Sequence, residues 1–190
     1  MKSICVYCGS NPGARSEYIE SAMQLGRFLA EKEIELVYGG AEVGLMGAVA
    51  SETLKNGGKV TGAITEFLAD KVAHNNLNYL YVVPTMHERK TKMFELSDGF
   101  IALPGGIGTI EELLEVLTWA QLGSHDKPCG MLNICGYFDS LLEFLDNAVN
   151  QQFVMPAHRD MLLIDNDPKA LLMQFETYKA PVTEKWISKN

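Results

Sequence analysis

The sequence lacks the apolar runs that membrane insertion and export require. No stretch of its 190 residues approaches the roughly 18 consecutive apolar positions of a transmembrane helix. The opening segment, MKSICVYCGSNPG, reaches glycine and asparagine after a few apolar positions, whereas the apolar core of a signal peptide is longer. We therefore expect a cytoplasmic protein without a membrane partner.

Basic residues are also in short supply. Lysine and arginine number 16 against 24 aspartates and glutamates, which gives a formal net charge of −8 at pH 7. Because nucleic acids and anionic membranes select basic surfaces, this balance argues against both as partners. It leaves room for a small phosphorylated ligand, which needs only a local cluster of hydrogen-bond donors.

Cysteine and histidine are too few and too scattered to indicate a metal site. Cys5 and Cys8 form a CxxC pair, but they stand in a strand-like run, where this odd spacing directs them to opposite faces. Cys129 and Cys135 have no companion histidine pair, and the four histidines show no metal-ligand spacing. We expect reduced, buried, structural cysteines, no metal, and surface or structural histidines.

What the sequence does contain is a regular alternation of short strand-like and longer helix-like segments. Strands are predicted at 3–8, 34–38, 59–64, 79–83, 99–103, 129–134 and 161–166, and helices at about 16–32, 44–56, 86–97, 109–122, 137–151 and 167–178. Such alternation is typical of parallel strands joined by right-handed crossovers. The predicted fold class is α/β: one Rossmann-like domain over residues 1–190, with a doubly wound parallel β-sheet and helices on both faces.

Glycine concentrates where the predicted strands end. The segments CGSNPG, YGGAEVG and LPGGIGT follow the first, second and fifth strands, at the carboxyl edge where doubly wound sheets bind ligands. One interpretation is tight turns. The other, for Gly-Gly-x-Gly-Thr directly before a helix, is an anion site of backbone N–H groups to which Thr109 adds a hydroxyl. The patterns G-x-G-x-x-G and G-x-x-x-x-G-K-[ST] are absent, which argues against a dinucleotide oxidoreductase and a P-loop NTPase.

The predicted helix at 86–97 carries an arginine on its inward face. Arg89 shares a stripe with Met86, Met93 and Leu96. Because an unpaired buried charge is costly, Arg89 needs an anionic partner. Its spacing leaves two candidates: a structural carboxylate or the anion of a ligand.

Two glutamates open the next predicted helix, where the helix dipole stabilises acids by roughly 0.3–1 kcal/mol. Glu112 shares a helix face with Val116 and Trp119, so we expect it to be half-buried, whereas Glu111 can remain a helix-end charge. If the fourth and fifth strands are neighbours, about 4.8 Å apart, Arg89 and Glu112 lie over one small ligand at the same sheet edge.

An anion site, an arginine and a partly desolvated carboxylate suit a reaction on a phosphorylated molecule in which positive charge develops. Cleavage of a glycosidic bond is such a reaction, because the sugar becomes oxocarbenium-like and a carboxylate can stabilise it or activate water. Dephosphorylation, isomerisation and binding without chemistry would fit the same residues.

Several segments carry a family resemblance. MHERK (86–90), PGGIGTIEE (104–112) and LTWAQLG (117–123) resemble the LOG (Lonely Guy) family, whose signature is P-G-G-x-G-T-x-x-E. The resemblance extends to CGSNPG, YGGAEVGLMG and HDKPCGMLN, and so covers most of residues 4–155. Members were long labelled lysine decarboxylases, but nothing in this sequence marks the pyridoxal-phosphate lysine of that chemistry.

The resemblance implies a Rossmann-like homodimer without metal or organic cofactor. It implies hydrolysis of the N-glycosidic bond of cytokinin riboside 5′-monophosphates, and often of AMP, to the free base and ribose 5-phosphate. It places the catalytic residues at Arg89 and Glu112. The substrate contacts that it implies are Lys90, Gly105, Gly106, Ile107, Gly108, Thr109, Ile110, Glu111 and Thr118.

One position departs from the family pattern. Relatives commonly carry an acidic residue just before the segment that matches VAHNNL (72–77), and here Lys71 stands there, with Asp70 before it. This departure leaves the base preference open. A non-catalytic carrier of a phosphorylated ligand, similar to the molybdenum-cofactor carriers, is the alternative function, and the presence of both Arg89 and Glu112 favours the enzyme.

Overall fold

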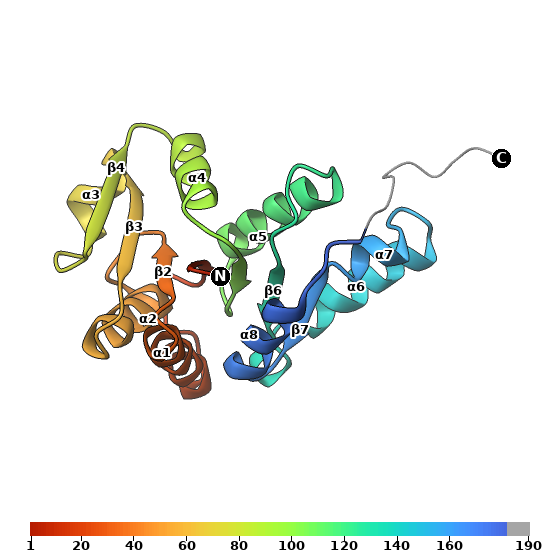
Figure 1. Ribbon diagram of the computed structural model, residues 1–190, viewed down its shortest axis with the longest axis horizontal. Coiled ribbons are helices and arrows are strands. Elements are labelled where there is room, and N and C mark those ends of the chain that lie inside the picture. Colours follow the sequence, from red (N-terminus) through yellow and green to blue (C-terminus); the bar gives the residue numbers. More distant parts are fainter. Residues whose placement is uncertain (182–190) are drawn as a thin grey trace.

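The structure is a computed structural model, which describes residues 1–181; residues 182–190 of the predicted domain lie outside the described part. A parallel sheet of seven strands runs through the described chain in the order β4-β3-β2-β1-β5-β6-β7 (Figure 1). The strands are β1 (Ser3–Tyr7), β2 (Glu35–Tyr38), β3 (Val60–Thr65), β4 (Tyr79–Val83), β5 (Phe100–Ala102), β6 (Cys129–Leu132) and β7 (Leu162–Asp165).

Helices cover both faces of this sheet. They are α1 (Ser16–Glu31), α2 (Gly44–Lys55), α3 (Glu66–Val72), α4 (Met86–Glu95), α5 (Ile107–Gln121), α6 (Asp139–Asn150), α7 (Pro156–Arg159) and α8 (Pro168–Thr177), with a 3-10 turn η1 (Ile134–Gly136) before α6. One hydrophobic cluster joins α1, α2 and α8 to one face, and a second joins α4, α5 and the start of α6 to the other. The predicted doubly wound α/β class is therefore confirmed.

The cysteines follow the same division of the core. Cys5 belongs to the cluster under α4 and α5, whereas Cys8 belongs to the cluster under α1 and α2, so the two thiols face opposite sides of β1 as predicted. Cys129 is also buried. Cys135 is exposed, contrary to the prediction, because it lies in a left-handed turn (φ 54°) after β6 rather than in the strand.

The fourth and fifth strands are not neighbours, so the condition under which Arg89 and Glu112 were expected to meet does not hold. Strand β4 lies at the sheet edge beside β3, whereas β5 pairs with β1 in the middle of the sheet. The chain builds outward from β1 to β4 and then returns through α4 to the other side of β1. This return makes the gap between β1 and β5 the point at which the strand order reverses, where doubly wound sheets form their ligand crevice.

Two short helices are absent from the sequence prediction. Helix α3 has seven residues, none of them buried, and α7 has four. Neither is long enough to show an apolar stripe of helical period. The other elements match their predicted ranges to within a few residues, including the seventh strand.

Within residues 1–181, no helix is long and apolar enough to cross a bilayer. In the same range, no three His, Cys, Asp or Glu side chains form a group that could hold a metal ion.

Candidate active site

Three glycine-rich turns meet at the carboxyl edge of the sheet, beside the reversal point. The Gly9 N–H after β1 donates to the Pro104 carbonyl after β5 at 3.0 Å. The Leu45 N–H in the first turn of α2 donates to the Gly9 carbonyl, also at 3.0 Å. The turns after β1, β2 and β5 therefore form one connected rim around the crevice.

The N-terminus of α5 presents unused backbone donors at this rim. Gly106 is the N-cap residue, and no side chain among residues 1–181 caps the helix. The N–H groups of Ile107, Gly108 and Thr109 precede the first intrahelical bond, which runs from Ile110 to the Gly106 carbonyl. A Cβ atom built at Gly106 or Gly108 would meet no heavy atom within 4 Å, so packing within the chain does not demand glycine there. The open space instead suits an anion that approaches the backbone closely.

Arg89 is buried at the floor of the crevice, as its helical phase predicts. Thr85 caps α4 by accepting a hydrogen bond from the Glu88 N–H at 3.2 Å, which fixes the first turn of the helix. Arg89 Nε donates to the Ala63 carbonyl of β3 at 2.9 Å, and the side chain is 8% exposed. The guanidinium therefore reaches from α4 across the end of β3 toward the middle of the sheet.

Glu112 is the carboxylate partner of this arginine. Arg89 Nη1 donates to Glu112 Oε1 at 2.7 Å, and the Glu112 side chain is 13% exposed. The two residues meet although their strands are not neighbours, because α4 lies across the face between β4 and β5 and rests beside α5 (Figure 1). Burial raises the pKa of Glu112 above the ordinary carboxyl value, and the Arg89 guanidinium offsets part of that rise.

A cavity of about 600 Å³ opens beside Arg89, and Glu112, which Arg89 contacts, is not one of its lining residues. Arg89 and Gly39 lie at its base, and the turn at Ser10–Pro12 forms one side. Its apolar wall consists of Ala41, Val43, Met46, Ile64, Leu68 and Val72. Such a volume, with few polar groups and one charged side chain, is typical of a site for a small organic molecule.

Helix α3 contributes to the cavity in a way that the sequence did not reveal. Leu68 and Val72 line the wall, whereas Lys71 lies over the exposed Phe67 ring at 3.9 Å, and both Lys71 and Asp70 are exposed. The residue that departs from the family pattern is thus not among the lining residues. The i,i+4 spacing of Leu68 and Val72 was the available signal, but α3 was too short to predict.

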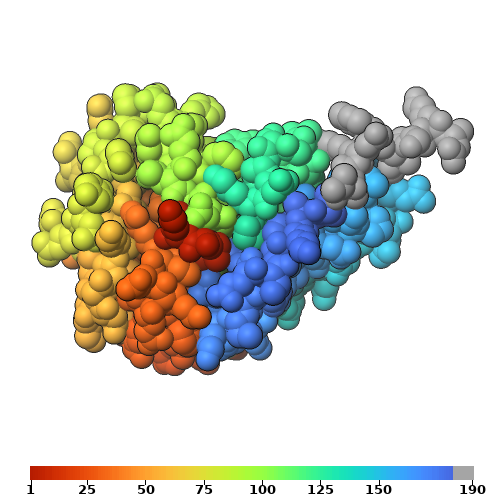
Figure 2. Space-filling view, viewed as in Figure 1, coloured from red at the N-terminus to blue at the C-terminus, as the bar shows by residue number. Residues whose placement is uncertain are grey.

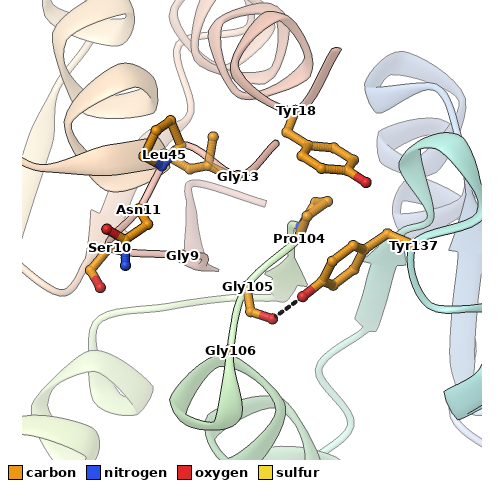
Figure 3. A pocket seen from close by; sticks show the side chains of 11 residues that line it. Gly9, Ser10, Asn11, Gly13, Tyr18, Leu45, Pro104, Gly105, Gly106 and Tyr137 are labelled. Atoms are coloured by element: carbon orange, nitrogen blue, oxygen red, sulfur yellow. Dashed lines mark hydrogen bonds between the residues drawn. The ribbon is translucent and has the colours of Figure 1, made fainter. Parts of the chain in front are cut away.

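A second, smaller cavity of about 230 Å³ lies on the other side of the Ser10–Pro12 turn. Gly9, Leu45 and the loop from Pro104 to Gly106 line it together with the rings of Tyr18 and Tyr137 (Figure 3). Neither tyrosine was a predicted site residue, because both stand outside the glycine-rich segments and Tyr137 follows a different strand, β6.

None of the remaining predicted contact residues lines the larger cavity, and Gly105 and Gly106 line the smaller one. Thr109 is buried against Gly105, whereas Ile107 is 88% exposed. Lys90 Nζ donates to Glu111 Oε1 at 2.6 Å and to Glu115 Oε1 at 3.0 Å on the outer side of α4 and α5. Thr118 Oγ1 donates to the Leu114 carbonyl at 2.7 Å, on an exposed face of α5. The substrate contacts proposed for all nine of these residues, and the catalytic roles of Arg89 and Glu112, stay predictions.

Fold and crevice together define a class: a Rossmann-like α/β protein whose sheet edge carries a glycine-rich loop at a helix N-terminus and a buried Arg–Glu pair. The family model described as "Possible lysine decarboxylase" matches residues 46–175. The chain belongs to that family, the LOG family.

Two relatives show how far the similarity extends. A cytokinin riboside 5′-monophosphate phosphoribohydrolase, LOG7 of Arabidopsis thaliana, is 46% identical over 184 residues, which cover 96% of this chain and 85% of the relative. A second relative is LOGL6 of Oryza sativa subsp. japonica, a probable cytokinin riboside 5′-monophosphate phosphoribohydrolase. It is 45% identical over 189 residues, which cover 99% of this chain and 75% of the relative.

Solved structures support the fold. The molybdenum cofactor binding protein of Rippkaea orientalis superposes with a TM-score of 0.70 at 21% identity, covering 93% of this chain and 97% of that one. The molybdenum cofactor carrier protein of Chlamydomonas reinhardtii gives a TM-score of 0.71 at 17% identity, covering 93% and 99%. At such identities the likeness bears on architecture and not on ligand.

Proposed function

We propose that this chain hydrolyses the N-glycosidic bond of adenosine 5′-monophosphates, both AMP and its N6-substituted cytokinin forms, to release the free base and ribose 5-phosphate. The Arg89–Glu112 pair carries the proposal: Arg89, which lines the larger cavity from the first turn of α4, donates to the carboxylate of Glu112 in the second turn of α5 at 2.7 Å. The relatives, whose names state this reaction for cytokinin riboside 5′-monophosphates, support it.

The residues divide the reaction between the two ends of the nucleotide. The first N–H groups of α5 and the Thr109 hydroxyl bind the phosphate end, because a helix N-terminus attracts anions. The apolar wall of the larger cavity receives the base and its N6 substituent. Glu112 then lies beside the ribose carbon that is bonded to the base.

Glu112 acts on the positive charge that develops at this carbon. Its ionised carboxylate stabilises the oxocarbenium-like sugar as the carbon–nitrogen bond to the base breaks, or accepts a proton from the attacking water as the new carbon–oxygen bond forms; the departing base takes up a proton from the solvent. Arg89 keeps Glu112 ionised and oriented and contacts the ribose or phosphate oxygens. A carrier that only binds a phosphorylated ligand would not need a buried carboxylate next to an anion site.

We further propose a homodimer and a cytoplasmic location. Helix α3, strand β4 and the start of α4 expose apolar side chains, namely Phe67, Tyr79, Tyr81, Val82 and Met86, which is unusual for a monomer surface. The exposed Thr118 would contact a nucleotide only from a partner subunit. The four cysteines are free thiols, as expected in a reducing compartment.

The test is direct. The protein is incubated with AMP and with N6-isopentenyladenosine monophosphate, and free base is followed by chromatography. We expect release of adenine or isopentenyladenine without added metal or cofactor. Failure to release either base at high enzyme concentration would overturn the proposal, and the ratio of the two rates gives the base preference.

A further inference from the structure

The proposed phosphate-binding loop before α5 accepts a hydrogen bond from a tyrosine that follows β6. Tyr137 donates its hydroxyl hydrogen to the Gly105 carbonyl at 2.6 Å, from 32 positions further along the chain (Figure 3). The Gly105–Gly106 peptide leads directly into Gly106, the N-cap residue of α5, so this bond acts on the backbone that precedes the helix N-terminus.

The Tyr137 ring has a well-defined position. The chain turns after β6 through two left-handed residues, Cys135 (φ 54°) and Gly136 (φ 70°), and the Tyr137 N–H closes the turn on the Ile134 carbonyl at 3.1 Å. The ring then packs edge-on against Phe138 and Tyr18, with centroids 4.9 and 5.6 Å away. Because both rings restrict it, the Tyr137 hydroxyl loses little further freedom when it bonds to Gly105.

The consequence follows from the planarity of the peptide. In a trans peptide the carbonyl of Gly105 and the N–H of Gly106 point in opposite directions. Holding the carbonyl on Tyr137 therefore directs the Gly106 N–H away from Tyr137. Within residues 1–181 this N–H has no protein acceptor, so it is available to a ligand.

Without such a bond the loop has an alternative. Two adjacent glycines have no Cβ to oppose rotation of the peptide between them. A rotated peptide would present a carbonyl oxygen where the N–H was, and that oxygen would repel a phosphate. The absence of Cβ atoms thus lets the loop backbone approach an anion closely, but it also lets the peptide rotate so that its carbonyl oxygen faces that anion.

We propose that Tyr137 is a positioning residue, which holds the Gly105–Gly106 peptide with its N–H available to the substrate phosphate. The proposal rests on the proposed function, because it takes the phosphate end of the nucleotide to bind at this loop. Tyr137 itself touches neither the base nor the bond that breaks.

The variant Tyr137→Phe tests this, because it removes the hydroxyl and keeps both ring contacts. Calorimetry then measures the dissociation constants of ribose 5-phosphate and of adenine. We expect ribose 5-phosphate to bind about fivefold to tenfold more weakly, which is the range of one lost hydrogen bond, and adenine to change by less than about twofold. With AMP as substrate, KM rises by a similar factor while kcat changes little.

Tyr18→Phe is the matched control. It removes a hydroxyl from the adjacent ring, which makes no hydrogen bond to the described residues, and leaves the Gly105 bond intact. Because Tyr18 lines the same small cavity as the loop, we expect a smaller loss of ribose 5-phosphate affinity in this variant than in Tyr137→Phe, and a melting temperature close to that of the parent in both variants.

Three results would overturn the inference: unchanged ribose 5-phosphate affinity in Tyr137→Phe, equal weakening of ribose 5-phosphate and adenine, or an equal effect of Tyr18→Phe. The outcome is separable from that of the proposed function. A parent that binds ribose 5-phosphate but cleaves no nucleotide overturns the function and leaves the role of Tyr137 measurable. A parent that cleaves AMP while Tyr137→Phe behaves identically overturns only the inference.

Discussion

Helices α4 and α5 are joined by two sets of ion pairs that differ by one residue on each helix. The inner pair is Arg89 with Glu112, whose side chains are 8% and 13% exposed. The outer set is Lys90 with Glu111 and Glu115, whose side chains are 12%, 51% and 27% exposed, so the two sets differ in the burial of their carboxylates rather than of their cations. In the space-filling view the two helices contact each other along one face of the molecule (Figure 2).

Both sets pair a basic residue of α4 with glutamates of α5, but the position of each residue around its helix gives the two sets different roles. One step along an α-helix rotates a side chain by about 100°, which brings the Glu111 carboxylate to the surface while the Glu112 carboxylate stays buried against Arg89. The inner carboxylate has its pKa raised by burial, a state that costs folding free energy and is common at catalytic sites. Burial acts to lower the pKa of Lys90, but its bonds to Glu111 and Glu115 outweigh that effect and raise it, as in a structural ion pair.

The largest effect is expected from Glu112→Gln. The amide keeps the shape of the side chain and can still accept a hydrogen bond from Arg89, but it carries no negative charge to stabilise an oxocarbenium-like sugar. We expect kcat for AMP to fall by about 10³-fold, within the range for loss of a catalytic acid or base. Base release measures activity, and calorimetry with ribose 5-phosphate serves as the control for an intact site. A variant that keeps a tenth of the activity would remove Glu112 from the mechanism.

Gly39→Ala perturbs the inner pair through its arginine. A Cβ at Gly39 would overlap Arg89 Nη2 and lie 2.7 Å from Met46 Cε. Because both atoms are at the ends of flexible side chains, the fold should tolerate the change, but the guanidinium has to move. We expect kcat/KM to fall by about tenfold to a hundredfold, as for a catalytic group displaced by about 1 Å, with little change in melting temperature.

A double-mutant cycle provides the check on this prediction. In an Arg89→Lys background the guanidinium is already absent, so Gly39→Ala should have little further effect on kcat/KM. If the loss of kcat/KM in the double variant equalled the product of the losses in the two single variants, Gly39 would act independently of Arg89.

The pH dependence of the reaction distinguishes the inner cation from the outer one. Glu112 works as a carboxylate, so kcat/KM should fall as the pH drops through its pKa, and that acid limb should lie above the ordinary range for glutamate. Arg89 and, less strongly, Lys90 lower this pKa. The variants Arg89→Gln and Lys90→Met should therefore both move the acid limb to higher pH, with the larger shift for Arg89→Gln. An equal shift in both profiles would contradict the distinction between the pairs.

The helix faces on which Arg89 and Glu112 lie were predictable from the sequence, but the contact between the two side chains was not. Local spacing is enough to turn Arg89 inward and to separate Glu112 from Glu111, because helical periodicity depends only on neighbouring residues. The contact between the two helices depends on strand order, which is a long-range property: β4 and β5 are consecutive yet separated by three strands. The same holds for Tyr137, whose role arises only when the segment after β6 folds beside the loop after β5.

The smallest effect is expected from Glu115→Gln in the outer set. Lys90 retains Glu111 as a partner at 2.6 Å, and partly exposed ion pairs contribute no more than about 1 kcal/mol each. We expect the free energy of unfolding in denaturant titrations to change by about 0.5 kcal/mol or less, with kcat for AMP unchanged. High salt should reduce even this difference, since screening weakens an exposed pair more than a buried one. A loss of activity comparable to that of Glu112→Gln would mean that both sets of charges belong to the catalytic site. The difference in burial between the two carboxylate sets would then not distinguish a catalytic ion pair from a structural one.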